Sequence, residues 1–495
     1  MNAEQVLSGV RLQSTLPAEL ASTPVQGLAY DSRNVAAGYL FFAFPGARAD
    51  GRAFAQSAMD RGAIAIVSEL PRPDDFAGAW IQVEHGRQAL AIAGRNFFER
   101  PDEQVALTGI TGTNGKTTTT YLIDSILRAA GSVTALIGTI EYHVAGKVLP
   151  AVNTTPESLD VYQILDEMRS LRGSQEARAT MEVSSHALAL GRVYGFRFHT
   201  AVFTNLTRDH LDFHETMENY FAAKHLLFES NGGRPPLYAV INRDDEYGKR
   251  IQPSAETQTF WYGLGPDANL RARHIDSSLK GLKFDLLAGK QRIDIASPLI
   301  GKINVYNILA AVGAGLSYGI DAATIARGIG QCAGIPGRFE RVDLGQPFAV
   351  VVDYSHTDDA LRNALTVARG LGPKRILTVF GCGGDRDRAK RPLMGKAAGE
   401  LSDFVILTSD NPRSEDPLQI MNDANVGLQR TESKHVFEPD REAAIRRAIE
   451  EARAGDFVLI AGKGHETYQI FKDRTIHFDD REVARSVLKE FGYPQ

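Results

Sequence analysis

The segment Thr-Gly-Thr-Asn-Gly-Lys-Thr at residues 111–117 constrains the fold of this chain more than any other feature of the sequence. An apolar run at residues 105–110 precedes it and is typical of a buried strand. Residues 122–130 then carry apolar side chains at helical spacing, and Gly131 is a natural stop for a helix. A strand, a glycine-rich loop and a helix in this order usually open a parallel α/β sheet. The sequence therefore predicts an α/β fold.

The same loop predicts nucleotide binding. Its glycines allow backbone N–H groups to close around phosphate, Lys116 reaches the outer phosphates, and the Thr117 hydroxyl can ligate Mg²⁺. The spacing departs from the strict phosphate-loop pattern, because Ile110 stands where the first glycine is expected. An ordinary glycine-rich turn is the alternative, but the flanking strand and helix disfavour it. The expected nucleotide contacts are Gly112, Thr113, Asn114, Gly115, Lys116, Thr117 and Thr118.

Length and composition limit the class of protein. The chain has 495 residues, enough for about three domains at roughly 150 residues each. Its 55 Lys and Arg against 60 Asp and Glu give a formal net charge of -5, and we expect no nucleic-acid partner because such proteins usually carry a basic excess. Two cysteines, Cys332 and Cys382, are too few for a disulfide framework or a cysteine-rich zinc site. Since the sequence shows neither a membrane-spanning apolar run nor a signal-peptide pattern, we expect a cytoplasmic protein with no membrane insertion.

Breaks in the pattern predict three domains, at residues 1–100, 101–335 and 336–495. Short apolar runs separated by turn-rich stretches indicate a small α/β first domain. In the last domain, strand-like runs at residues 349–352, 375–380, 404–407 and 457–460 and a helical segment at 441–454 are typical of a Rossmann-like sheet. A polar loop follows each of these runs, and ligands of such sheets bind beyond the carboxyl ends of the strands.

A candidate metal site follows the phosphate loop in the sequence. Glu182 stands beside the hydroxyls of residues 184 and 185, and residues 204–212 bring acidic side chains and His210 into one short loop. Mg²⁺ prefers oxygen ligands, although imidazole can serve. His214 and His225 have no such support and are expected to be structural.

These motifs together resemble the Mur ligase family, the ATP-dependent amide-forming enzymes of peptidoglycan synthesis. The similar segments run in the family's order along nearly the whole chain: 31–33, 50–51, 111–117, 153–155, 182–186, 205–212, 220–224, 304–307, 337–338 and 353–357. The resemblance implies three domains: a small α/β UDP-binding domain, a central P-loop-type parallel-sheet ATPase domain and a C-terminal Rossmann-like domain that binds an amino acid. It also explains the unusual spacing of the phosphate loop as a family variant.

The resemblance assigns site residues position by position. Further ATP contacts are expected at Asn304, Arg338 and Asp353. Contacts to the UDP-substrate are expected at Tyr30, Ser32, Ala47, Arg48, Ala49, Asn153, Thr154, Thr155, Ser184 and Arg192. The expected catalytic residues are Lys116, Glu182, His210 and Lys224, and the expected Mg²⁺ ligands are Thr117, Glu182, His210 and Lys224. Lys224 is implied to be carbamylated to N6-carboxylysine, whereas a lysine judged by residue type alone is usually solvated at the surface.

Within the family, Asp410-Asn411-Pro412-Arg413 resembles the recognition motif of the enzymes that add meso-2,6-diaminopimelate as the third residue of the stem peptide. Diaminopimelate differs from lysine by a second carboxylate, which a guanidinium fork can bind in a bidentate manner. Glu466 is expected to pair with an ammonium group. The expected amino-acid contacts are Arg386, Asp410, Asn411, Pro412, Arg413, Gly462 and Glu466.

The implied reaction joins diaminopimelate to UDP-N-acetylmuramoyl-L-alanyl-D-glutamate through an acyl phosphate, with ATP as co-substrate and Mg²⁺ as cofactor. Small molecules are thus the expected partners, and we expect a monomer. An L-lysine-adding ligase of the same family is the nearest alternative, but in such an enzyme Arg413 would have no second carboxylate to bind. A folate polyglutamate ligase, a P-loop ATPase and a nucleotide-sensing module are more distant alternatives. The last two would bind or hydrolyse ATP without forming an amide.

Three residues depart from the family pattern. Leu190 stands where a glutamine that contacts the UDP-substrate is common. Ser355 and Asp358 replace the usual alanine and proline after Asp353. Because proline stiffens a turn, Asp358 is expected to loosen this loop.

Overall fold

The computed structural model describes residues 1–46 and 49–493. Contacts divide the chain into two units, one of Met1–Arg271, Leu287–Ile293 and Tyr306–Gly328, the other of Ala272–Leu286, Asp294–Val305 and Ile329–Gln495. The domain boundaries near residues 100 and 335 stay predictions. No helix of the described residues combines the length and the apolar character needed to cross a membrane.

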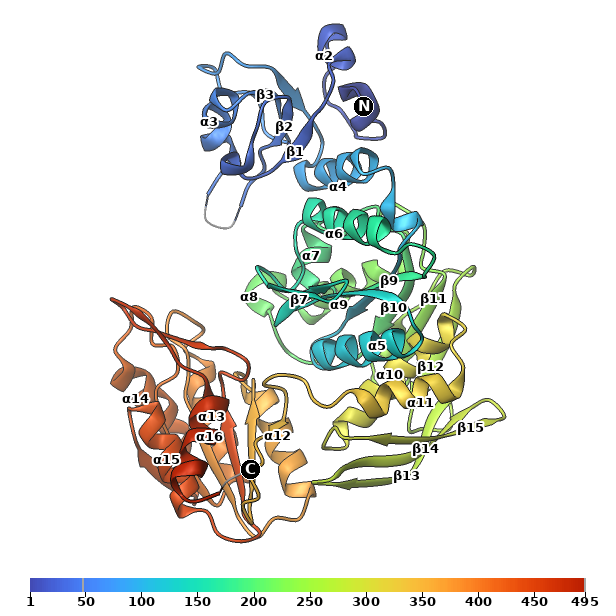
Figure 1. Cartoon of the computed structure of the whole chain (residues 1–495). Coiled ribbons are helices and arrows are strands. Elements are labelled where there is room, and N and C mark those ends of the chain that lie inside the picture. The colour runs from blue at the N-terminus through green and yellow to red at the C-terminus, as the bar shows by residue number, and fades with distance from the viewer. Residues whose placement is uncertain (47–48, 494–495) are drawn as a thin grey trace. The chain divides into compact units, whose positions relative to one another are not determined.

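The first unit opens with a small parallel sheet of order β1-β2-β3-β4 (Figure 1). Its strands are β1 (Gly27–Ala29), β2 (Tyr39–Phe42), β3 (Ala63–Ser68) and β4 (Trp80–Gln82), and its helices are α1 (Ala3–Val6), α2 (Ala18–Ser22), α3 (Ala55–Asp60) and α4 (Gly86–Phe97). Core clusters lie on both faces of the sheet, with Leu40 in one and Phe41 in the other. Burial on both faces explains why these strands are continuous apolar runs rather than alternating ones.

A second sheet follows, with the order β12-β11-β10-β5-β9-β6-β7-β8 within this unit. Its strands are β5 (Ala106–Thr111), β6 (Val133–Ile137), β7 (Glu141–Val144), β8 (Lys147–Pro150), β9 (Ala177–Glu182), β10 (Phe198–Phe203), β11 (Tyr238–Asn242) and β12 (Gln258–Gly263). The associated helices are α5 (Lys116–Ala129), α6 (Ser158–Leu171), α7 (Ser185–Ala189), α8 (Leu211–His214) and α9 (Met217–His225). All neighbouring strands pair in parallel except β6 with β7 and β7 with β8, which pair antiparallel. The predicted strand, loop and helix around residue 111 are confirmed.

The register of the central strands brings three loops to one edge of this sheet. Thr111, the last residue of β5, pairs with Phe203, the last residue of β10. On its other side, Ile110 pairs with Glu182, the last residue of β9. The segments that follow residues 111, 182 and 203 therefore leave the sheet side by side, and they are the segments that carry the expected phosphate and metal ligands.

In the sequence, the segment between β12 and the C-terminal sheet forms strands and helices whose residues are divided between the two units. They are β13 (Leu270–Ser278), β14 (Gly281–Ala288), β15 (Gln291–Ser297), α10 (Ile303–Ser317) and α11 (Ala322–Gln331).

The second unit contains a sheet of order β16-β17-β21-β18-β19-β20, in which only β16 is antiparallel. Its strands are β16 (Glu340–Arg341), β17 (Ala349–Asp353), β18 (Ile376–Phe380), β19 (Phe404–Leu407), β20 (Lys434–Phe437) and β21 (Phe457–Ala461), followed by the hairpin of β22 (Tyr468–Ile470) and β23 (Thr475–His477). Its helices are α12 (Asp358–Gly370), α13 (Lys390–Leu401), α14 (Pro417–Leu428), α15 (Arg441–Glu451) and α16 (Asp480–Glu490). The four predicted strands are confirmed, and so is the helix from residue 441, which ends earlier than predicted.

A buried ion pair ties this sheet to its helices. The guanidinium of Arg441 donates to both carboxylate oxygens of Asp480 at 2.7 Å, and both side chains are fully buried. Arg441 also donates to the carbonyl oxygens of Ser409, beyond β19, and Ala461, at the end of β21. The first residue of α15 therefore holds the ends of two strands whose loops carry expected site residues.

Replacing Asp480 with asparagine is expected to destabilise the fold by about 3–5 kcal/mol, because it leaves the buried Arg441 charge without its counter-charge. Urea denaturation followed by circular dichroism measures the change. Glu490→Gln is the control, since Glu490 pairs with Arg446 at the surface and its loss is expected to matter little. Equal stability of Asp480→Asn and the parent protein would contradict this role for the pair.

Candidate functional site

The phosphate loop is held in shape by the loop that follows β10. The backbone N–H of Thr113 donates to the carbonyl oxygen of Asn205 at 2.8 Å, and the N–H of Asn114 donates to the Asn205 side chain at 3.0 Å. The Thr204 hydroxyl donates to the carbonyl oxygen of Asn114 at 2.7 Å. Gly112 has a φ of 145°, and a Cβ there would lie 1.9 Å from Thr204 Oγ1, so only glycine fits.

Helix α5 begins at Lys116, directly after this loop, with Gly115 as its N-cap in the left-handed region. Gly115 contributes no side-chain cap. The first N–H groups of a helix point outward along its axis, where they favour an anion such as phosphate. A Cβ at Gly115 would lie 2.3 Å from the side-chain oxygen of Asn307, which places α10 against the loop. The predicted loop residues thus form a turn that leads into a helix N-terminus, an arrangement suited to phosphate.

Two lysine side chains meet at the start of the loop. Lys116 Nζ donates to the carbonyl oxygens of Gly112 and Thr113, each at 2.9 Å. Lys224 Nζ donates to the same Gly112 oxygen, also at 2.9 Å. Lys224 is buried, with 2% of its surface exposed, and is therefore not the solvated lysine that residue type alone suggests. Its burial, reinforced by the charge of Lys116, lowers the pKa of the Lys224 amine well below the ordinary value.

Glu182 is buried at the end of β9, and its carboxylate is fixed by Thr139. The N–H of Thr139 donates to Glu182 Oε1 at 2.9 Å, and its hydroxyl donates to Oε2 at 3.1 Å. The Thr139 hydroxyl also lies 3.2 Å from that of Thr154. Thr154, an expected substrate residue, is thereby linked to an expected metal ligand.

Other expected substrate residues join the same network. Thr155 Oγ1 donates to the carbonyl oxygen of Glu182 at 2.8 Å and accepts from the N–H of Ser184 at 3.0 Å. Arg192 donates to the carbonyl oxygen of Thr155 at 3.1 Å and lies 3.0 Å from the carboxylate of Glu157. One expected metal ligand and four expected substrate contacts therefore form one connected cluster: Glu182, Thr154, Thr155, Ser184 and Arg192.

The predicted metal ligands suit Mg²⁺ only in part as they stand. Thr117 and Glu182 offer the hard oxygen donors that Mg²⁺ prefers. His210 is half exposed, with its ring 4.9 Å from that of His186, and Lys224 offers oxygen only if it is carbamylated. Among the described residues, no three His, Cys, Asp or Glu side chains are placed to hold a metal. His214, expected to be structural, is buried with Nε2 2.9 Å from Ser185 Oγ.

The remaining expected substrate residues lie around the small N-terminal sheet and the β7–β8 hairpin. The Tyr30 hydroxyl donates to Asp160 of α6 at 2.7 Å, and Ser32 is buried. Tyr30 and Asp160 also line a cavity of about 410 Å³. The N–H of Asn153 donates to the hydroxyl of Tyr142 at 3.1 Å. Ala49 is exposed, whereas Ala47 and Arg48 lie outside the described residues.

The second unit holds the other expected ATP contacts. The guanidinium of Arg338 lies 4.7 Å from the Tyr354 ring centroid, and Asp353 accepts a hydrogen bond of 2.7 Å from the N–H of Phe339. Asn304 is buried and donates to the carbonyl oxygen of Ile300 at 2.8 Å. A Cβ at Gly337 would lie 2.0 Å from the His465 nitrogen, so this glycine permits close packing against the loop after β21.

The structure places Asp358 in a helix, and the expected loosening of the loop after Asp353 stays a prediction. Asp358 is the first residue of α12, where a carboxylate is favoured by the helix dipole, and Thr357 caps this helix. Ser355, the other departure, donates to the carboxylate of Asp353 and to the carbonyl oxygen of Ala360. Ser355 thus adds hydrogen bonds to this segment, and Asp358 adds a carboxylate at the start of α12.

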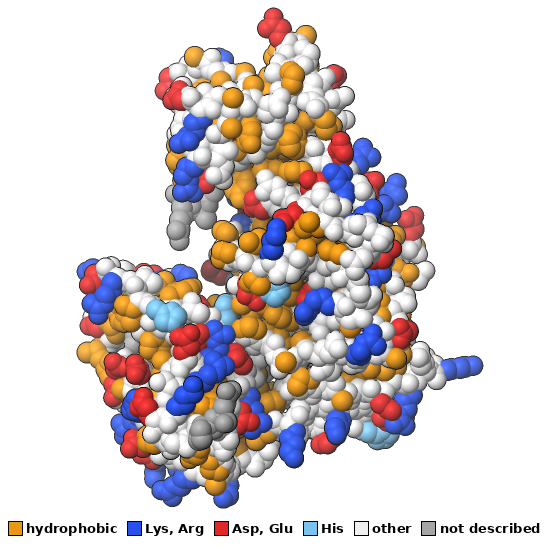
Figure 2. Space-filling view, in the orientation of Figure 1, with side chains coloured by type: hydrophobic (Ala, Val, Ile, Leu, Met, Phe, Trp, Pro, Cys, Tyr) orange, Lys and Arg blue, Asp and Glu red, His pale blue; other side chains and the backbone are white. Residues whose placement is uncertain are grey.

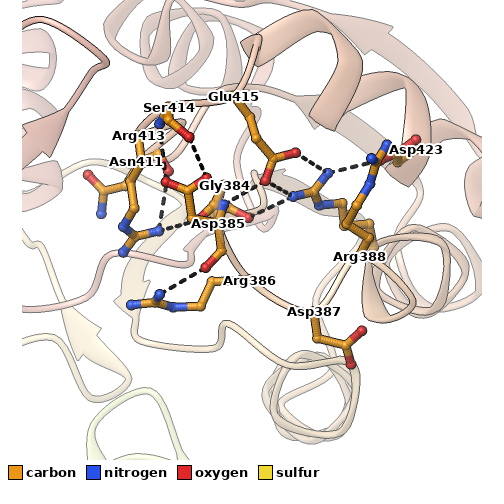
Figure 3. A network of polar contacts seen from close by, with 12 residues as sticks. Gly384, Asp385, Arg386, Asp387, Arg388, Asn411, Arg413, Ser414, Glu415 and Asp423 are labelled. Carbon is orange, nitrogen blue, oxygen red and sulfur yellow. Dashed lines mark hydrogen bonds and ion pairs between the residues drawn. The ribbon is translucent and has the colours of Figure 1, made fainter. Parts of the chain in front are cut away.

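Hydrogen bonds join two loops of the C-terminal sheet that carry expected amino-acid contacts (Figure 3). Arg413 Nη1 donates to the carbonyl oxygen of Gly384 at 2.7 Å, and the N–H of Gly384 donates to that of Asn411 at 2.9 Å. Ser414 Oγ donates to Asp385 at 2.6 Å. Arg386 is exposed and donates to the carbonyl oxygen of Asp385 at 3.0 Å. The structure thus brings the two predicted guanidinium groups onto neighbouring loops.

Two cations beside these loops were missed by sequence reasoning. Arg391 is buried, with 1% of its surface exposed, and binds Glu415 through two hydrogen bonds of 3.0 and 2.7 Å. Lys463 is fully buried between Asn411 and Glu466. The only sequence signal for Lys463 is its place between two glycines in a polar loop after a strand, and nothing in the sequence marks Arg391.

The distribution of charged side chains on the surface agrees with the composition of the sequence, which has no basic excess. On the face shown in Figure 2, Lys and Arg side chains are interspersed with Asp and Glu side chains.

Comparison with known proteins assigns nearly the whole chain. Residues 24–98 match the model described as Mur ligase family, catalytic domain; residues 110–315 match the Mur ligase middle domain; and residues 337–464 match the Mur ligase, glutamate ligase domain. A protein of Solibacter usitatus named UDP-N-acetylmuramoyl-L-alanyl-D-glutamate–2,6-diaminopimelate ligase is 68% identical over the full length of both chains. A protein of the same name from Geobacillus thermodenitrificans is 46% identical over 94% of this chain and 95% of its own.

A solved structure supports the same assignment. The structure of a UDP-N-acetylmuramoyl-L-alanyl-D-glutamate–2,6-diaminopimelate ligase is 34% identical, has a TM-score of 0.69, and covers 97% of each chain. The three family models match successive parts of the chain, and the predicted three-domain α/β architecture is confirmed. On these grounds, the chain belongs to the Mur ligase family of ATP-dependent ligases.

Proposed function

We propose that this chain joins meso-2,6-diaminopimelate to UDP-N-acetylmuramoyl-L-alanyl-D-glutamate, with conversion of ATP to ADP and phosphate. The observation that carries the substrate assignment is the Asp410–Arg413 loop, in which Arg413 is held by the loop at Gly384. The full-length relatives bear the name of this activity. We also propose that the protein acts in the cytoplasm as a monomer.

In the first step, a glutamyl carboxylate oxygen of the UDP-substrate bonds to the γ-phosphorus of ATP, and the bond to the ADP oxygen breaks. Lys116 and the N-terminus of α5 hold the phosphates and neutralise their charge. The cluster of Thr154, Thr155, Ser184 and Arg192 orients the UDP-substrate. Thr117, Glu182, His210 and carbamylated Lys224 would hold Mg²⁺, which supplies further neutralisation of phosphate charge when bound.

In the second step, a neutral amine of diaminopimelate bonds to the acyl carbon, loses a proton, and phosphate leaves. Arg413 and Arg386 provide guanidinium donors for the carboxylate that lysine lacks. No described residue accepts a hydrogen bond from Arg413 Nε or Nη2, so part of its fork remains for that carboxylate. Glu466 provides the acceptor for an ammonium group.

Lys224 is expected to take up carbon dioxide near neutral pH. Carbamylation requires a neutral amine, and the lowered pKa of Lys224 keeps this amine neutral over a pH range in which an exposed lysine is charged. With carbon-13 bicarbonate, we expect a carbamate resonance in the protein and its loss in Lys224→Met. Lys147→Met, at an exposed lysine, should keep the resonance. A resonance that survives in Lys224→Met would place the carbamate elsewhere.

An amino-acid screen tests the proposed function. Purified protein is incubated with ATP, Mg²⁺ and UDP-N-acetylmuramoyl-L-alanyl-D-glutamate, and phosphate release and product mass are followed with each amino acid. We expect release and the tripeptide mass with meso-diaminopimelate and neither with L-lysine. Activity with lysine instead would keep the ligase chemistry and refute the substrate, whereas phosphate release without a new product would indicate an ATPase.

A further inference from the structure

Lys463 is a fully buried lysine among the residues expected to bind the amino acid, although none of the expected contacts includes it. It follows β21, and its Nζ donates to Asn411 Oδ1 at 3.3 Å, to Glu466 Oε2 at 3.3 Å, and to the carbonyl oxygen of Tyr468. An ammonium has three donors, so these three acceptors satisfy it without water.

The partners of Lys463 are also joined to one another. Asn411 Nδ2 donates to Glu466 Oε2 at 2.8 Å, and Asn411 Oδ1 accepts from the N–H of Ile470 at 2.9 Å. Lys463, Asn411 and Glu466 therefore form a closed triangle against the β22 strand. Every described contact of the Glu466 carboxylate is made by Oε2, and no described residue donates to Oε1.

The charged groups around this triangle show how the Lys463 ammonium affects the Glu466 carboxylate. Burial and the carboxylate of Asp410 raise the pKa of Glu466, and the Lys463 ammonium and the Asn411 hydrogen bond oppose that rise. The other groups that face Glu466 are Tyr354, Tyr468 and the Arg441 guanidinium. Lys463 is the cation in direct contact with the carboxylate, at 3.3 Å.

We propose that Lys463 is a positioning residue for the amino-acid substrate: its buried ammonium fixes Glu466 and Asn411 so that Glu466 Oε1 is presented to an ammonium group of the substrate. This proposal rests on the proposed function. It does not place Lys463 in contact with the substrate, because its three donors are already used by the protein.

Lys463→Met removes the charge and keeps most of the side-chain volume. We expect its KM for meso-diaminopimelate to rise about 10- to 100-fold, the range for loss of a hydrogen bond to a charged group. KM for ATP should stay within about twofold of the parent value, because none of the expected ATP contacts belongs to this triangle. Lys472→Met is the matched control, since Lys472 is an exposed lysine in the adjoining β22–β23 hairpin. It should match the parent protein.

The pH dependence separates positioning from a structural defect. Without the Lys463 ammonium, the pKa of Glu466 rises further, so a larger fraction of its carboxylate is protonated at a given pH, and this fraction falls as the pH increases. The ratio of KM in Lys463→Met to KM in the parent should therefore fall as the pH increases. A misfolded or loosened site would give a ratio that does not fall with pH.

A double variant tests whether Lys463 acts through Glu466. If it does, adding Lys463→Met to Glu466→Gln should change KM for diaminopimelate by less than about threefold. If Lys463→Met does not fold, Lys463→Gln, which keeps a donor without the charge, takes its place in the same measurements. An unchanged KM, an equal rise in KM for ATP, or full additivity with Glu466→Gln would overturn the proposal. Failure of the parent protein to form the tripeptide would instead refute the proposed function.

Discussion

Replacing Lys116 with methionine is expected to lower the rate of ATP-dependent amide formation by about 10²- to 10³-fold, the cost of removing one preorganised charge-stabilising donor. Lys116 Nζ is held by two carbonyl oxygens of the phosphate loop, those of Gly112 and Thr113. Methionine has a similar length but neither charge nor donor, so the developing charge on the transferred phosphoryl group loses its partner. Steady-state measurement of kcat and of KM for ATP checks this effect.

Lys147→Met is the control for this variant. Lys147 is an exposed lysine paired with Glu167 at 3.0 Å, and its loss should leave kcat within about twofold of the parent value. Circular dichroism shows whether Lys116→Met keeps its fold. If folded Lys116→Met turns over ATP at the parent rate, residues 112–118 are not the site of phosphoryl transfer.

Replacing Arg413 with methionine is expected to lower kcat/KM for meso-diaminopimelate by about 10²- to 10³-fold, within the range for truncating one partner of a charge pair. The half-buried Arg413 is held at a backbone φ of 54°, and its N–H donates to the carbonyl oxygen of Ile470 at 3.0 Å. Its guanidinium is thus presented from a fixed backbone. Because L-lysine lacks the second carboxylate, the selectivity for diaminopimelate over lysine should fall by a similar factor.

Arg388→Met is the matched control for Arg413→Met. Arg388 lies on the neighbouring loop, but its partner is Asp423, and most of its side chain is exposed (Figure 3). This control should keep the parent selectivity. Equal losses of activity with diaminopimelate and with lysine in Arg413→Met would show that Arg413 supports the loop without recognising the second carboxylate.

Local patterns in the sequence were enough to predict several of the elements that carry the site. The strand before residue 111, the helix after it and the strands β17, β18, β19 and β21 follow from apolar runs and turn residues that lie next to one another in the chain. The strands β7, β8 and β20 were not predicted, and neither were the central strands β6, β9, β10 and β11. All four residues of β8 are exposed, so no alternation of buried and exposed side chains marks this strand in the sequence.

The sequence by itself determined the phosphate loop, the parallel α/β architecture and the polar loops at the carboxyl ends of the strands, because each depends on residues close together in the chain. Only the tertiary structure decided which residues from distant parts of the chain contact one another in a site. Lys224 and Gly112 are 112 positions apart, and Lys463 and Asn411 are 52 apart. Whether a lysine is a solvated surface residue or a buried one depends on such distant partners. Burial in the fold removes water from these groups and makes their hydrogen bonds obligatory, which no local pattern records.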